Sequence, residues 1–129
     1  MSYKIVHLSD VKDVLGDYPG EMRMMKADLE TEQVAMTYRR MPAKTGARGS
    51  HGHLHQEQEE VTFVISGSLQ VKLDDKVVEL KKHDAIRIAP GVVRGFWNEG
   101  PDDAELIIVS TRLDHNDSER VENFWPDES

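Results

Sequence analysis

Histidines at alternate positions precede an apolar run that ends in glycine, in residues 51–67 (HGHLHQEQEEVTFVISG). Side chains of a β-strand alternate between its two faces, so His53 and His55 point the same way, with Cα atoms roughly 6.6 Å apart. Two imidazoles at this spacing can bind one ion, and Glu60 offers a carboxylate beside them. Zinc, iron, nickel and manganese accept nitrogen and oxygen ligands of these kinds. The segment therefore predicts a β-strand that carries a metal site.

A third histidine, His51, shares the parity of His53 and His55. On a regular strand its Cα would lie roughly 13 Å from that of His55, which is too far for both side chains to bind one ion. Gly52 would have to bend the chain to bring His51 closer. His51 is therefore a reserve ligand, and the predicted metal ligands are His53, His55 and Glu60.

Alternating patterns continue along most of the chain. Short segments rich in β-branched and aromatic residues are separated by Gly, Asp, Pro and Asn, as is typical of strands and turns. The predicted strands span residues 33–40, 61–66, 69–73, 76–80, 85–88, 92–97 and 105–111. Short strands at short intervals predict an all-β barrel or sandwich with little helix.

The length of 129 residues and the hydrophobic content of 38% suit one domain with a single core. We expect one domain over residues 1–129, with a barrel core at about 33–111 and N-terminal strands within 1–32. Residues 112–129 are polar and acidic apart from Val121, Phe124 and Trp125. This polar tail is either frayed or a strap that docks its aromatic side chains.

Charge and composition exclude several classes of partner. The chain has 24 acidic and 16 basic residues, a net charge of -8, and no basic stripe, so we expect no nucleic-acid partner. It has no cysteine, so a metal would need nitrogen and oxygen ligands. We find no signal-peptide pattern and no apolar run approaching about 18 residues. We therefore expect a cytoplasmic protein that does not bind membranes.

The strand that carries Glu60 also has an apolar second face. If Glu60 and Thr62 face the site, then Val61, Phe63 and Ile65 point to the opposite side. This face is too apolar to remain in water, so either the N-terminal strands or a second subunit must cover it. We predict a homodimer.

The pattern of residues 51–67 resembles the first motif of the cupin superfamily. That motif has two histidines separated by one residue, a glutamate three or four residues later, and a glycine after six more. His53, His55, Glu60 and Gly67 satisfy it with the four-residue option. The resemblance covers residues 41–111 and implies a small double-stranded β-helix (jelly-roll) barrel, often dimeric, with the site inside.

The second cupin motif is similar to residues 83–98 (HDAIRIAPGVVRGFWN). Gly91 and Asn98 fall where the motif expects them. Three positions depart from it: His83 replaces the first glycine, Ala89 replaces the proline, and Arg94 replaces the histidine.

The third departure concerns the site directly, because the replaced histidine is the fourth protein ligand of metal-binding cupins. A guanidinium has no lone pair to offer and stays charged in proteins, so Arg94 cannot bind a metal. Strand alternation would still aim Arg94 into the barrel. There it could hold a substrate carboxylate beside the ion, or pair with Glu60 and occupy the metal's place.

Two functions follow from the resemblance. The first is a metal-binding enzyme of dioxygenase, isomerase or lyase type that acts on a small anionic organic molecule. It would use one divalent transition metal (Fe, Mn, Ni or Zn), with Arg94, Thr62 and Phe96 in contact with the substrate and catalytic residues unidentified. The alternative is a non-catalytic cupin that binds or senses a small molecule, metal-free if Arg94 fills the metal position.

Overall fold

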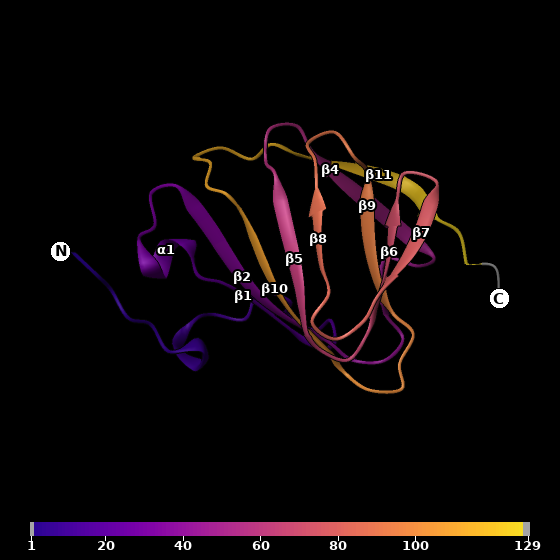
Figure 1. The fold of residues 1–129 in the computed structure, drawn as a ribbon, viewed down its shortest axis with the longest axis horizontal. Coiled ribbons are helices and arrows are strands. Elements are labelled where there is room, and N and C mark those ends of the chain that lie inside the picture. The colour runs from indigo at the N-terminus through magenta and orange to yellow at the C-terminus, as the bar shows by residue number, and fades with distance from the viewer. Residues whose placement is uncertain (1, 128–129) are drawn as a thin grey trace.

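Two antiparallel β-sheets face each other in the computed structural model, which describes residues 2–127 (Figure 1). The five-stranded sheet has the order β1 (Glu21–Met24), β2 (Val34–Met41), β10 (Ala104–Thr111), β5 (Glu60–Ser66) and β8 (Ala85–Ile88). The six-stranded sheet has the order β11 (Ser118–Trp125), β4 (Ser50–His55), β9 (Arg94–Asn98), β6 (Leu69–Leu73) and β7 (Lys76–Leu80), and β3 (Thr45–Gly46) also pairs with β9.

Helix is limited to two short segments in the part of the chain that the structure describes. One is a 3₁₀ turn, Leu8–Asp10, and the other is α1, Lys26–Leu29. Within residues 2–127 there is no helix with the length and apolar character needed to cross a membrane. The all-β fold class predicted from the sequence is therefore confirmed, with strands close to the seven segments expected from alternation.

Strand β5 shows why the alternation predicts the fold well. Glu60, Thr62 and Val64 are buried on its inner face, whereas Val61 and Phe63 on its outer face are 39% and 38% exposed. The inner faces of both sheets contribute to one apolar cluster. Its buried members are Met41, Val64, Leu69, Val71, Leu80, Ile88, Phe96, Ala104 and Leu106.

The outer face of the five-stranded sheet is covered in part by the N-terminal segment. Ile65 and Ile107 pack against a second buried cluster of Val11, Met25 and Tyr38. Further along the same face, Phe63 keeps its exposure and stacks on His83 with ring centroids 6.0 Å apart. Cover by the same chain thus accounts for only part of this apolar face.

The C-terminal segment forms strand β11, which pairs with the histidine strand β4. Ser118 lies opposite His55, and Arg120 lies opposite His53. The ring of Phe124 packs directly over Gly52, where an added Cβ would come within 2.4 Å of a ring carbon. Of the two alternatives for this segment, the structure therefore has the docked strap.

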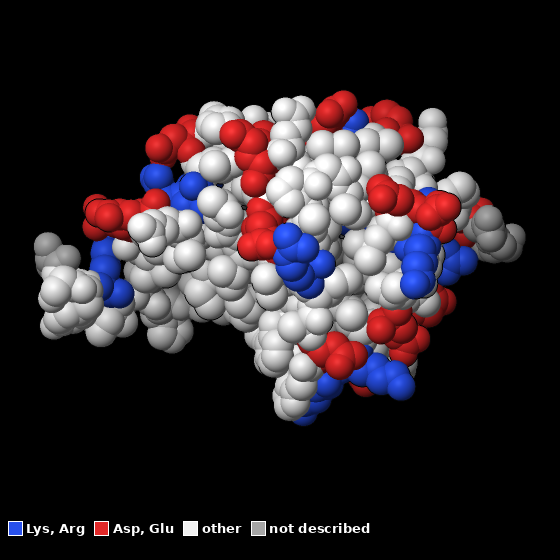
Figure 2. All heavy atoms as spheres, turned by 45° about the horizontal axis from the view of Figure 1, so that its top comes forward, with Lys and Arg blue, Asp and Glu red and all other residues white. Residues whose placement is uncertain are grey.

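Charged side chains are mixed on the face of the molecule seen in Figure 2. Lysine and arginine side chains there lie among aspartate and glutamate, separated by broad uncharged areas. This distribution agrees with the acidic net charge of -8 and offers no continuous basic surface on that face for a phosphate backbone.

Gly67→Ala tests the turn after β5. Gly67 has φ 74°, and a Cβ there would lie 2.4 Å from the carbonyl oxygen of Asp103. We expect the variant to lose about 1–3 kcal/mol of unfolding free energy, measured by urea denaturation. Gly16→Ala is the control, because Gly16 has φ 65° but no atom within 4 Å of an added Cβ. Equal losses in the two variants would show that the Asp103 contact does not matter.

Candidate functional site

A cavity of about 580 Å³ opens between the two sheets. Most of the residues that the sequence proposed for a site contribute to its wall: His51, His53, His55, Glu60, Arg94 and Phe96. Thr62 is the exception. It is fully buried, its hydroxyl has no hydrogen-bond partner, and it does not line the cavity. The structure thus brings one face of β4 together with Glu60 of β5 and Arg94 of β9.

Arg94 is the most unusual of these residues. It lies opposite His53 in the pairing of β4 with β9, and its side chain is 0% exposed. All three guanidinium nitrogens lack a hydrogen-bond partner, and Nε lies 3.9 Å from Oε1 of Glu60. Burial lowers the pKa of Arg94, while the charges of Glu60 and Asp117 oppose this shift. A guanidinium remains protonated in proteins, so a positive charge is buried here with its donors unused.

The two central histidines lie edge to face. The ring centroids of His53 and His55 are 5.1 Å apart, with an interplanar angle of 89°. Burial lowers the pKa of His53 to about 4, and the positive charges of His55, Arg94, His51 and Arg39 act in the same direction. His53 is therefore a neutral imidazole near pH 7. His51 contacts its neighbour Ser50 through Nδ1 at 3.1 Å.

His55 is held by a carboxylate that the sequence reading missed. Its Nδ1 lies 2.8 Å from Oδ1 of Asp117, and Oδ2 of Asp117 accepts the backbone N–H groups of Glu57 and Gln58, each at 2.9 Å. Burial raises the pKa of Asp117, but the bonds from His55 and the two amides outweigh it and bring the pKa to about 2. Asp117 is therefore an acceptor, which assigns the proton to Nδ1 of His55.

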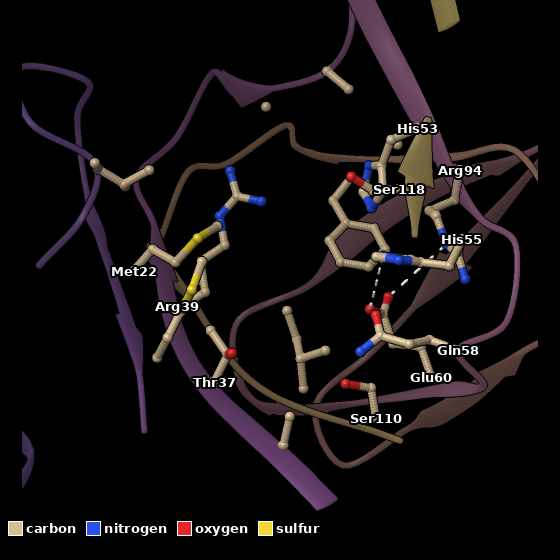
Figure 3. Close-up of a pocket in the computed structure, with 18 of the residues that line it drawn as sticks. Met22, Thr37, Arg39, His53, His55, Gln58, Glu60, Arg94, Ser110 and Ser118 are labelled. Atoms are coloured by element: carbon tan, nitrogen blue, oxygen red, sulfur yellow. Dashed lines mark ion pairs between the residues drawn. The ribbon is translucent and has the colours of Figure 1, made fainter. Parts of the chain in front are cut away.

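The second nitrogen of His55 faces Glu60. Nε2 of His55 lies 3.7 Å from Oε2 of Glu60, and Figure 3 shows Glu60 between His55 and Arg94, with both ion pairs drawn as dashed lines. Acidic and basic groups thus alternate in one row, in the order Asp117, His55, Glu60 and Arg94. This row of side chains leads from the strap before β11 to the cavity wall.

The donor set does not fit a resident metal ion as it is arranged. Within residues 2–127, no group of three or more His, Asp or Glu side chains is placed to hold one ion. The charge of Arg94 beside Glu60 would also repel a cation. Metal binding by His53, His55 and Glu60, with His51 in reserve, therefore stays a prediction.

Comparison with protein families finds one match. The model of the cupin domain family matches residues 40–110, which is more than half of the chain. A comparison with curated proteins finds no significant match.

Solved structures share the fold at low sequence identity. The polyketide cyclase RemF from Streptomyces resistomycificus has a TM-score of 0.74 and 21% identity, over 94% of this chain and 85% of its own. A cupin protein from Bacteroides fragilis has a TM-score of 0.70 and 18% identity, over 88% and 87%. A sugar phosphate isomerase from Silicibacter pomeroyi has a TM-score of 0.69 and 19% identity, over 85% and 76%. These likenesses establish the fold and not the activity.

The low pKa of His53 predicts a loss of stability in acid. Its pKa falls from 6.5 in the unfolded chain to about 4 in the folded one. Between these values the unfolded state binds the extra proton, so folding weakens as pH falls. We expect urea denaturation to show that His53→Gln removes about 2 kcal/mol of the stability difference between pH 7 and pH 4.5.

The control for this pH dependence is His115→Gln. Glu57 raises the pKa of His115, so this exposed histidine acts in the opposite direction. An unchanged difference in His53→Gln would contradict the assignment of a buried neutral imidazole.

Asp117→Asn tests the support of His55. The amide keeps the shape but loses the charge that accepts three hydrogen bonds, so we expect a loss of about 2 kcal/mol in unfolding free energy. Nitrogen NMR should also show a shift of the His55 proton away from Nδ1. Asp114→Asn is the control, because the Asp114 side chain is 83% exposed. An unchanged His55 tautomer in Asp117→Asn would remove Asp117 from this role.

Proposed function

The chain belongs to the cupin family, and on that premise we propose that its barrel binds a small organic anion through Arg94. The supporting observation is the fully buried guanidinium with three nitrogens that have no hydrogen-bond partner. Leaving donors of a charged group unpaired in a protein interior costs several kcal/mol. A carboxylate or phosphate oxygen that reached Arg94 would remove that cost, and its fork geometry favours such groups.

Glu60 is the group that competes with an anion for Arg94. Its carboxylate lies 3.9 Å from Nε, which is beyond hydrogen-bond distance. A ligand anion reaches the guanidinium by turning this carboxylate aside, because Arg94 presents no surface to solvent in this conformation. Removing the charge of Glu60 should therefore help an anion bind.

Two substitutions with opposite expected effects test anion binding. The probes are hexanoate and its neutral amide, hexanamide, measured by isothermal titration calorimetry. We expect hexanoate to bind more tightly than hexanamide, Arg94→Gln to weaken hexanoate at least tenfold, and Glu60→Gln to tighten it. The control is Arg87→Gln, because the Arg87 side chain is 63% exposed and pairs with Glu59 at the surface.

A gain of affinity in Glu60→Gln cannot come from misfolding, so it keeps the test valid even if Arg94→Gln is unstable. Equal affinities for hexanoate and hexanamide in the unmodified protein would contradict the proposal. An unchanged hexanoate affinity in Arg94→Gln would do the same.

Arg94→His addresses the predicted metal. It supplies an imidazole where the second cupin motif has one, next to His53, His55 and Glu60. We expect the variant to retain near-stoichiometric metal after dialysis against zinc or nickel, read by elemental analysis of tag-free protein. The unmodified protein should retain far less. Stoichiometric metal in the unmodified protein would show that Arg94 does not occupy the metal's place.

Turnover of the bound anion is a second candidate function. It is favoured by the contacts that link Asp117 to His55 and His55 to Glu60. A carboxylate and an oriented imidazole can move a proton next to an anchored substrate. Two of the similar structures are named as a polyketide cyclase and a sugar phosphate isomerase. The probe is exchange of the C3 protons of 2-oxohexanoate in D₂O, followed by NMR. Loss of exchange in His55→Gln would support turnover. If the unmodified protein shows no exchange, turnover is contradicted and only the proposed anion binding remains.

A homodimer remains part of the proposal. Val61, Phe63 and Val109 stay 36–39% exposed on the outer face that the N-terminal segment covers only in part. A second subunit on this face would remove these side chains from water.

A further inference from the structure

The cavity contains a second arginine, Arg39, which has no acidic partner among the described residues. Arg39 extends from β2 and lines the cavity, and its Nε is buried without a hydrogen-bond partner. Its side chain forms no hydrogen bond or ion pair with any residue in the described range 2–127. Burial lowers its pKa, and the only group that opposes this is Tyr18. Among residues 2–127, no carboxylate pairs with this charge.

The other arginines of the described chain behave differently. Each donates to a carboxylate oxygen at 3.2 Å or closer. They are Arg23, Arg40, Arg48, Arg87, Arg112 and Arg120. With 24 acidic side chains available, a lack of carboxylates does not explain the contrast. The two exceptions are the arginines that line the cavity. Arg39 has no acidic partner among the described residues, and Arg94 has only the long ion pair with Glu60.

These two arginines lie on opposite walls. Arg39 pairs with Met22 and Leu106 in the five-stranded sheet, whereas Arg94 pairs with His53 and Leu73 in the six-stranded sheet. Figure 3 shows Arg39 beside Met22 on one side of the pocket and Arg94 with His55 and Glu60 on the other. The two guanidinium groups thus enter the cavity from different sheets and stand apart in Figure 3, so each can bind a different anionic group.

Apolar side chains form much of the cavity lining. Met22, Met24, Met36, Phe96 and Ile108 line the cavity together with the two arginines. Methionine side chains adapt their shape to an apolar ligand, so they can pack against the body of a ligand, while His51, His53 and Ser118 offer polar contacts beside it.

Positive charge dominates the interior. Among the described lining residues, Glu60 is the only acid against Arg39, Arg94 and Lys26. A protein with a net charge of -8 thus encloses a cationic cavity.

We infer that the ligand of this barrel carries two anionic groups joined by an apolar spacer, one group bound by Arg94 and the other by Arg39. The inference rests on the anion binding proposed above and adds the class of ligand, an elongated dianion such as a dicarboxylate. A second carboxylate at Arg39 gives its guanidinium the acceptor that residues 2–127 do not supply.

A matched pair of ligands distinguishes the contributions of the two arginines to binding. Hexanoate and adipate have the same carbon chain, and adipate has one more carboxylate. By isothermal titration calorimetry we expect adipate to bind at least tenfold more tightly than hexanoate. Arg39→Gln should abolish this advantage and weaken hexanoate much less than adipate. Affinity along succinate, adipate and suberate should pass through a maximum, because both ends must reach an arginine.

The control is Arg120→Gln, whose arginine is 63% exposed and pairs with Glu122. Arg39→Gln breaks no hydrogen bond, so we expect it to remain folded, which thermal unfolding checks. If hexanoate binds through Arg94 but adipate binds no more tightly, the dianion inference is wrong and the proposed function stands. The same holds if Arg39→Gln weakens both ligands equally. If neither ligand binds, the proposed function fails and the inference fails with it.

Discussion

The buried positive charge of Arg94 is the constraint on which the arrangement of the site depends. It comes from β9 in the six-stranded sheet, and its one ion pair, at 3.9 Å, is with Glu60 of β5 in the five-stranded sheet. This interaction links the two sheets across the lumen. The charge also helps to keep His53 neutral, since protonation would place a second cation beside the first. The charge of Arg94 therefore acts on both Glu60 and His53.

Most of the fold could be predicted from the alternation of apolar and polar residues, because a strand buried on one face has a sequence pattern with a period of two. The match between predicted and observed strands is close for β5 to β8, where short turns leave little freedom. The backbone conformation at His83 follows from its place in the second cupin motif, where His83 replaces a glycine. His83 keeps φ 74°, the left-handed conformation that glycine favours, so the turn survives without the glycine. Strand β11 was harder to predict because its sequence is polar and its pairing is distant.

The site could be predicted only in part. Residue parity placed Glu60 and Arg94 inside the barrel, and the structure has both there. Asp117 could not be found in this way, since it reaches His55 across 62 positions of sequence. Arg39 was not predicted as a site residue, because its lack of a carboxylate partner is visible only in the tertiary structure. Arg40, its neighbour, pairs with Glu21 and Asp103, so only the tertiary structure separates the two arginines.

The late position of Asp117 and β11 has a consequence for how the molecule matures. A ribosome releases the chain from its N-terminus, so β2 to β10 emerge before residue 117 does. Until then β4 has an unpaired edge, and His55 lacks the carboxylate that orients it. The barrel can begin to assemble during synthesis, but the site is completed only when the strap arrives. Translation order thus delays a fully oriented site until most of the chain has been made.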